Sequence, residues 1–175
     1  MTTHRTSADL VAAPDQEHFR EVLGHFASGV IAVTGTAPDG GPAGLTVSSF
    51  TSVSLEPPLL SFCVAHTSRS WPRLRASKGV CVNILSDGQQ DVATRLARSD
   101  ERKFEGLRLS SSPGGLPVLD GALAWLEGAV VAEHPAGDHD IVVVQVHRLA
   151  AAGRLGPLLR FRGAFERLAE RREGA

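Results

Sequence analysis

The chain has 175 residues, of which 42% are hydrophobic and 21% are charged, and these values are ordinary for a soluble globular protein. A chain of this length forms one compact domain and buries enough surface to fold without disulfide or metal staples. A formal net charge of -1 gives no electrostatic reason to expect nucleic acid or an anionic membrane as a partner.

The first element expected is a helix that follows a short arm. Residues 1–14 are expected to form a flexible N-terminal arm and residues 15–170 a single domain. Asp15 suits the cap of a helix that runs to about Ser28. Four apolar residues of this helix recur at the spacing of one buried helical face: Phe19, Val22, Leu23 and Phe26.

Most of the remaining chain reads as strands. Runs rich in β-branched residues predict strands at 30–36, 44–50, 51–56, 59–65, 80–85, 123–133 and 141–149. Short helices are expected after Ser68 and over 87–98. Because these strands follow one another without a helix between each pair, they favour an antiparallel barrel with helices outside over a doubly wound parallel sheet.

Three segments between or after these elements are expected to be irregular or helical. Pro57-Pro58 should stop strand pairing, since proline has no N–H to donate. Residues 100–117 form a polar loop that is long enough to be functional. In the tail from 158 to 172, Phe161, Phe165 and Leu168 have the spacing of one helical stripe.

The two cysteines, Cys63 and Cys81, lie in apolar strand-like runs and are expected to be buried thiols rather than a disulfide framework. The N-terminus has no hydrophobic signal core, and no apolar run approaches the roughly 18 residues of a membrane helix. These features predict a cytoplasmic protein with no membrane or nucleic-acid partner.

The most informative stretch runs from Gly44 to Phe62. Its apolar residues have the pattern of a sheet, and between them lie six hydroxyls: Thr46, Ser48, Ser49, Thr51, Ser52 and Ser54. Such a row can bind a polar, planar ligand while the backbone stays paired. An amphipathic strand pair with a hydrated hydroxyl face remains the alternative.

Three further segments carry candidate chemistry, each with a plainer alternative. His139 lies between Asp138 and Asp140, which favour its charged form, at the mouth of a strand, although a solvated turn would look the same. The segment 66–71 combines hydroxyls, a guanidinium and a helix start, which suits a phosphate or an ordinary helix cap. The segment 158–163 pairs an aromatic ring with two arginines, as a ring-stacking clamp or an exposed tail would.

Other site signatures are absent from the sequence. The seven histidines are scattered, with no HExxH and no paired cysteines, so no metal site is expected. Neither Gly-x-Ser-x-Gly nor a GxGxxG or P-loop motif occurs.

Six segments, in this order along the chain, carry a resemblance to a known family: 26–34 (FASGVIAVT), 44–58 (GLTVSSFTSVSLEPP), 68–72 (SRSWP), 82–85 (VNIL), 137–139 (GDH) and 157–163 (PLLRFRG). Over about residues 17–167 the chain resembles the short-chain flavin reductases, which are the reductase components of two-component flavin-dependent monooxygenases. That family has a mainly β fold, a split antiparallel β-barrel (the FMN-binding split barrel) with a few flanking helices.

The resemblance implies roles by position. The flavin ring would be lined by Thr46, Val47, Ser48 and Ser49, with Cys63, Val64 and Ala65 beneath it. The phosphate and ribityl chain would be held by Ser68, Arg69, Ser70 and Trp71, with Lys103 and Phe104 near the phosphate and the cofactor tail. His139 would face the nicotinamide as the catalytic-site residue, and Phe161 and Arg162 would close the site.

The resemblance also implies a homodimer that reduces FMN or FAD with NADH or NADPH and supplies reduced flavin to a partner monooxygenase. Two alternatives stay open: a flavoprotein that keeps its flavin and acts directly on a small substrate, and a flavin-binding protein without turnover.

The chain departs from the family in two ways. It has no tyrosine, so Phe161 and Phe165 keep a ring without a hydroxyl. Asp140 follows the histidine, and its negative charge favours NADH over NADPH.

Overall fold

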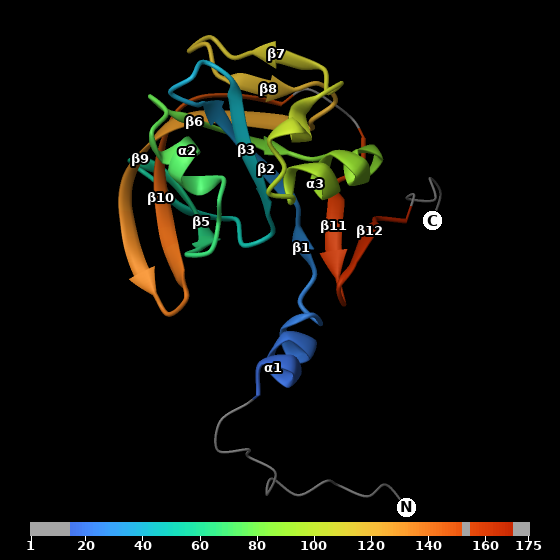
Figure 1. Ribbon diagram of the computed structural model, residues 1–175. Helices are drawn as coiled ribbons and strands as arrows, with labels where there is room; N and C mark the ends of the chain where they lie inside the picture. The colour runs from blue at the N-terminus through green and yellow to red at the C-terminus, as the bar shows by residue number, and fades with distance from the viewer. Residues whose placement is uncertain (1–14, 152–154, 170–175) are drawn as a thin grey trace, which may run out of the picture.

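The computed structural model describes residues 15–151 and 155–169, which form a β-barrel with helices outside it (Figure 1). The strands are β1 (Ser28–Gly29), β2 (Ile31–Thr36), β3 (Pro42–Val47), β4 (Thr51–Leu55), β5 (Pro58–Ala65), β6 (Val80–Ile84), β7 (Leu109–Ser111), β8 (Pro117–Leu119), β9 (Ala124–Ala136), β10 (His139–Ala151), β11 (Leu158–Phe161) and β12 (Ala164–Arg167). The α-helices are α1 (Gln16–Leu23), α2 (Trp71–Arg75) and α3 (Gln90–Leu96), and the 3₁₀ helices are η1 (Asp87–Gln89) and η2 (Glu101–Phe104).

The main sheet contains seven strands in the order β3-β2-β6-β9-β10-β5-β4, and all of its pairings are antiparallel. Its two edge strands, β3 and β4, are consecutive in the chain and are joined only by residues 48–50. The sheet therefore curls until its edges approach, and the barrel is split there. This arrangement agrees with the antiparallel barrel predicted from the order of the strands.

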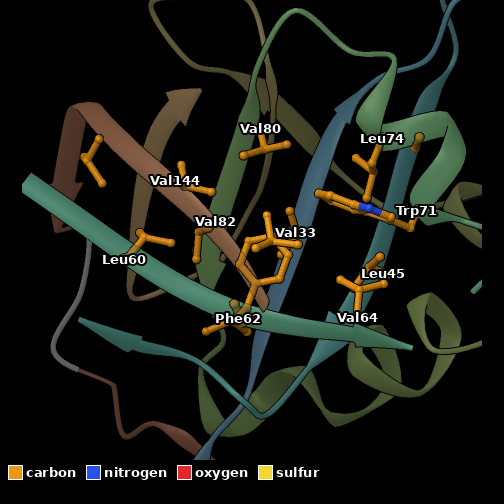
Figure 2. Close-up of a cluster of buried hydrophobic side chains, with 14 of the residues drawn as sticks. Val33, Leu45, Leu60, Phe62, Val64, Trp71, Leu74, Val80, Val82 and Val144 are labelled. Atoms are coloured by element: carbon orange, nitrogen blue, oxygen red, sulfur yellow. The ribbon is translucent and has the colours of Figure 1, made fainter. Parts of the chain in front are cut away.

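The barrel interior is filled by branched and aromatic side chains that converge from strands on all sides (Figure 2). Phe62 on β5 meets Trp71 edge to face, with ring centroids 5.7 Å apart. Trp71 and Leu74 come from α2, so this short helix closes one end of the barrel. Burying these side chains supplies the main stabilisation of the fold.

A second core lies outside the barrel, between β2 and the helices that follow β6. It contains Val30, Ala32, Leu85, Ala93, Leu96, Phe104, Leu119 and Leu158. Because β2 is covered on both faces, all residues from Ile31 to Gly35 are buried. The Asn83 side chain, which is fully buried, donates to the Ala32 carbonyl and accepts from the Leu119 N–H, so it ties β2, β6 and β8 together.

The N-terminal helix differs from the prediction. It ends at Leu23 rather than near Ser28, and in this described segment none of its side chains is buried. Phe19, Val22 and Leu23 are each about half exposed, and Phe26 is 79% exposed. The sequence predicted a buried apolar face on this helix. The apolar face exists, but no described residue of the same chain covers it.

The tail is a hairpin of β11 and β12 rather than the predicted helical stripe. Arg162 and Gly163 at its turn have φ values of 46° and 79°, and positive φ at both central residues is typical of the tight turn that joins two twisted strands. The sequence pattern was misleading because Phe161 and Phe165 belong to different strands.

Two smaller expectations also need correction. Pro57-Pro58 does not stop pairing: Pro57 lies in the turn between β4 and β5, and Pro58 begins β5 opposite Leu55. The segment 100–117 is not a plain loop, because it contains η2 and β7.

Cys81 is buried as expected, and burial raises the pKa of its thiol to about 12, whereas Cys63 is only half-buried. The expected arm, 1–14, lies outside the described residues.

Candidate functional site

A cavity of about 480 Å³ lies at the split of the barrel, where the end of β3 faces the end of β5. Its walls contain eleven of the predicted site residues: Thr46, Val47, Ser48, Ser49, Cys63, Val64, Ala65, Ser68, Arg69, Ser70 and His139. Residues that are distant in the sequence are brought together because β3 and β5 are next to each other only when the sheet curls.

The hydroxyls of this wall have different roles. Thr46 donates to the Ala93 carbonyl of α3 over 2.9 Å. The Ser49 hydroxyl accepts from the Cys63 N–H at 2.8 Å and donates to the Cys63 carbonyl, so it ties the connection between β3 and β4 to β5. Ser48 lies exposed at the rim of the cavity. Thr46 and Ser49 therefore shape the cavity, and Ser48 presents its hydroxyl to it.

The opposite end of the cavity is basic. Arg69 and Ser70 lie there, and the Lys103 ammonium donates to the Ser70 hydroxyl over 2.6 Å and to the Arg98 carbonyl over 3.2 Å. The α2 helix has only five residues and is too short for its N-terminus to serve as an anion site. The capacity of this end of the cavity to bind an anion therefore comes from side chains. Burial, and then the neighbouring Arg73 charge, lower the pKa of Lys103 to about 8.

Phe104 was predicted at the cofactor tail, and the structure places it in the second core, where it is 9% exposed. Its ring packs on Gly44 of β3, where a Cβ atom would lie 2.8 Å from the ring. Glycine at 44 thus lets η2 approach β3. Phe104 anchors η2, and this anchoring holds Lys103 at the basic end of the cavity.

Trp71 lies in the barrel core, away from the cavity. Its ring packs on Phe62 and its Nε1 donates to Glu133 over 3.4 Å. The Trp71 N–H donates to the Ser68 hydroxyl over 3.2 Å. Trp71 therefore shapes the 68–70 segment from behind.

A second, larger cavity of about 880 Å³ adjoins the first and shares Ser48 and His139 with it. It lies between α1, the tip of the β9–β10 hairpin and the β11–β12 turn. Arg162, which was predicted to close the flavin site, lines this second cavity, with its guanidinium 5.3 Å from the Phe161 ring centroid. Arg160, from the candidate segment 158–163, and Arg20, which sequence reasoning missed, add positive charge to its wall.

His139 is the first residue of β10, at the junction of the two cavities. Its Nδ1 lies 2.7 Å from Asp138 Oδ1, and this hydrogen bond holds the pKa of Asp138 below its ordinary value. Asp140 faces elsewhere, since its carboxylate is 3.2 Å from His66 Nε2. Of the two acidic neighbours predicted to favour the charged form of His139, only Asp138 contacts it.

Most of the residues that sequence reasoning missed in the first cavity come from the end of α3 and the residues that follow it. Leu96 to Ser99 contribute to its wall. They carry no motif, and only the packing of α3 against β3 brings them there. Among the described residues, no cluster of His, Cys, Asp and Glu side chains has the makings of a metal site. Within the same part of the chain, no helix is both long and apolar enough to cross a membrane.

Comparisons with known proteins agree with this geometry. The family model for the flavin reductase like domain matches residues 23–169. A flavin reductase from Pseudomonas putida is 42% identical over 162 residues, which cover 92% of this chain and 95% of that protein. The flavin-dependent monooxygenase reductase subunit HsaB from Rhodococcus jostii is 40% identical over 153 residues, covering 87% and 78%.

A solved structure shares the fold. It is the Streptomyces globisporus NADH:FAD oxidoreductase in complex with NAD and FAD fragments, which matches with a TM-score of 0.85 and 33% identity over 94% of this chain and 99% of that one. The fold and site thus define a split-barrel protein with a long cavity that is basic at one end. The chain belongs to the flavin reductase-like domain family. The predicted family, fold and class of enzyme, a flavin reductase, are confirmed.

The residues present fit a flavin. The cavity offers the apolar Val47 and Val64 beside hydroxyls, which suits a ring with polar edges, and the cations Arg69 and Lys103 near one end, which suits a phosphate.

Proposed function

We propose that this protein uses NADH to reduce a flavin and releases the reduced flavin to a separate monooxygenase. The single observation that carries the proposal is the junction of the two cavities at Ser48 and His139. One cavity fits a flavin, and the adjoining one is wide and basic enough for a dinucleotide. The relatives described above, an NADH:FAD oxidoreductase and a monooxygenase reductase subunit, support it.

When bound, the flavin supplies the hydride-accepting chemistry, so the protein's own residues bind, orient and shield the flavin and the nicotinamide. In this proposal the backbone of Thr46 to Ser49 and the hydroxyl of Ser48 hold the ring edge, and Cys63 to Ala65 form the floor. Arg69, Ser70 and Lys103 bind the phosphate. His139, oriented by Asp138, positions the nicotinamide, and rate enhancement comes from holding two rings in contact.

We infer a preference for NADH over NADPH. The wall of the second cavity carries arginines, but Asp138 lines the same cavity and Asp140 is the residue next to His139. A negative charge on the wall of this cavity disfavours the additional 2′-phosphate of NADPH.

We also infer that two copies associate through α1. Its apolar face is exposed and borders the second cavity through Phe19, Leu23 and Phe26. A second copy of the chain seated on this face would bury it and would enclose a cavity that is otherwise open to solvent. In the same proposal, a separate monooxygenase component receives the reduced flavin.

A stopped-flow experiment with NADH and free flavin under anaerobic conditions tests the reductase function. We expect NADH oxidation at 340 nm to require added flavin and to follow flavin bleaching with the same rate constant. NADH oxidation that does not respond to FMN or FAD would contradict the proposal. A flavin that stays with the protein through gel filtration and reduces a small substrate directly would support the flavoprotein alternative instead.

A further inference from the structure

A third cavity of about 270 Å³ continues the flavin cavity beyond its basic end. The two share Arg69, Ser70 and Ser99. The third cavity is smaller than the roughly 300–1,000 Å³ of pockets that enclose a complete small ligand. Its size and its continuity with the flavin cavity therefore suit the extension of a ligand that is already bound, rather than a separate molecule.

The wall of this third cavity is positively charged. Arg69, Arg73 and Lys103 line it, against the single carboxylate of Asp100. Arg73 comes from α2 and pairs with Asp39 in the β2–β3 turn, with 2.6 Å between Nη2 and Oδ2. A guanidinium has five N–H donors, so this ion pair fixes the Arg73 side chain at the cavity and leaves donors for an anion.

The cavities follow β3 in order. The flavin cavity lies along Leu45 to Ser49, and the third cavity lies along Pro42 to Gly44. At roughly 3.3 Å per residue, the third cavity extends the groove by about 10 Å. FMN ends at the phosphate held near Arg69 and Ser70, so it leaves this basic extension empty. FAD continues from the same phosphate into a second phosphate and an adenosine.

We propose that the third cavity receives the part of FAD that lies beyond the FMN phosphate, namely the second phosphate and the adenosine, so that the protein selects FAD over FMN, with Arg73 as a specificity-determining residue. The inference rests on the proposed function, because it assumes that a flavin occupies the adjoining cavity. Arg73 acts on the second phosphate, which FMN lacks.

Isothermal titration of FAD and FMN into four forms of the protein tests this. The forms are the wild type, Arg73→Ala, Arg73→Lys and Arg75→Ala. Arg75 is the matched control: it lies on the same helix, but its guanidinium pairs with Glu133 at 2.8 Å, outside the third cavity. Thermal melts of each form establish that it is folded.

We expect wild-type protein to bind FAD at least about tenfold more tightly than FMN, as one added charge-assisted hydrogen bond allows. Arg73→Ala should reduce the FAD-to-FMN affinity ratio by about tenfold. Arg73→Lys should restore part of the ratio, because lysine keeps the charge but loses the planar fork. Arg75→Ala should keep the wild-type ratio.

The possible failures are distinguishable. Equal affinity for both flavins in the wild type, or an unchanged ratio in Arg73→Ala, would overturn the FAD selectivity while NADH-dependent reduction of either flavin still upheld the proposed function. Failure to bind or reduce any flavin would overturn the proposed function, and this inference with it.

Discussion

At the scale of single residues, several polar side chains that suit a ligand are already engaged within the protein. The Ser49 hydroxyl bonds both the N–H and the carbonyl of Cys63, and Thr46 bonds a carbonyl of α3. Their contribution is to hold the walls of the cavity in place, because each hydroxyl already has a hydrogen-bond partner in the protein. Ser48 and His139 lie at the junction of the two cavities, where the proposed function has them meet both rings.

His139→Ala should raise the KM for NADH by about tenfold, the value of one lost hydrogen bond to a positioned ring, and should leave the flavin Kd within about twofold. Steady-state kinetics with varied NADH and a separate flavin titration measure the two effects. His134→Ala is the matched control, since His134 lies exposed on the same hairpin outside both cavities. Unchanged kinetics in His139→Ala would rule out the assigned role.

The affinity for FMN should depend on pH through Lys103. Its pKa in the free protein is about 8, so the ammonium is present below this pH and lost above it. A dianionic phosphate favours the charged form, and its binding therefore takes up a proton above the pKa. We expect the FMN affinity to be level from pH 7 to about 8 and then to fall by up to about tenfold per pH unit.

Fluorescence titration of FMN between pH 7 and 9.5 measures this dependence, in a range where the phosphate remains dianionic. Riboflavin, which lacks the phosphate, should show a flat profile. Lys103→Arg should also flatten the FMN profile, because a guanidinium keeps its charge throughout. A decline that persists in Lys103→Arg would assign the pH dependence to another group.

At the scale of elements, the sequence pattern of α1 predicts a buried apolar face, whereas the described structure leaves that face exposed. Its apolar residues have the spacing of a buried face, yet Val22 is 53% exposed and Phe26 is 79% exposed. Figure 1 shows the helix standing apart from the barrel. An amphipathic helix with no cover in its own chain is stable only where its apolar face packs on another molecule.

Val22→Glu should therefore convert a dimer into monomers, because it places a charge in the proposed interface. Val22 lies outside the second cavity, so the change leaves the cavity wall intact. Sedimentation velocity at micromolar concentration measures the mass. Glu21→Gln, on the polar face of the same helix, should stay dimeric. A wild-type protein that sediments as a monomer would refute the proposed association.

At the scale of the whole molecule, the active region exists because the sheet curls. The edge strands β3 and β4 lie at opposite ends of a seven-stranded order, although only residues 48–50 separate them in the chain. A flat sheet of this order would place Thr46 far from Cys63. Curling, which follows from the right-handed twist of antiparallel strands, brings the ends of β3 and β5 together and opens a cavity between them.

The same reasoning explains which expectations were wrong. The β-branched runs of β2, β5, β6 and β10 were predicted well, because a strand buried on one or both faces needs those residues wherever it lies. The tail failed because Phe161 and Phe165 fit a helical spacing while a positive-φ turn at Arg162-Gly163 separates them. Trp71 and Phe104, predicted at the ligand, lie in the two cores behind the cavity, because large rings within a motif can serve the core behind a site.

The sequence by itself determined the seven strands of the main sheet, their antiparallel pairing as a class, the family and most of the residues that line the first cavity. These depend on local composition and on motifs that stay close together in the chain. Only the tertiary structure decided that Arg73, Ser99 and Lys103 share one basic cavity, that two larger cavities meet at His139, and that α1 is uncovered. These facts depend on contacts between distant segments, and such contacts follow from the curl of the sheet and the packing of helices on it.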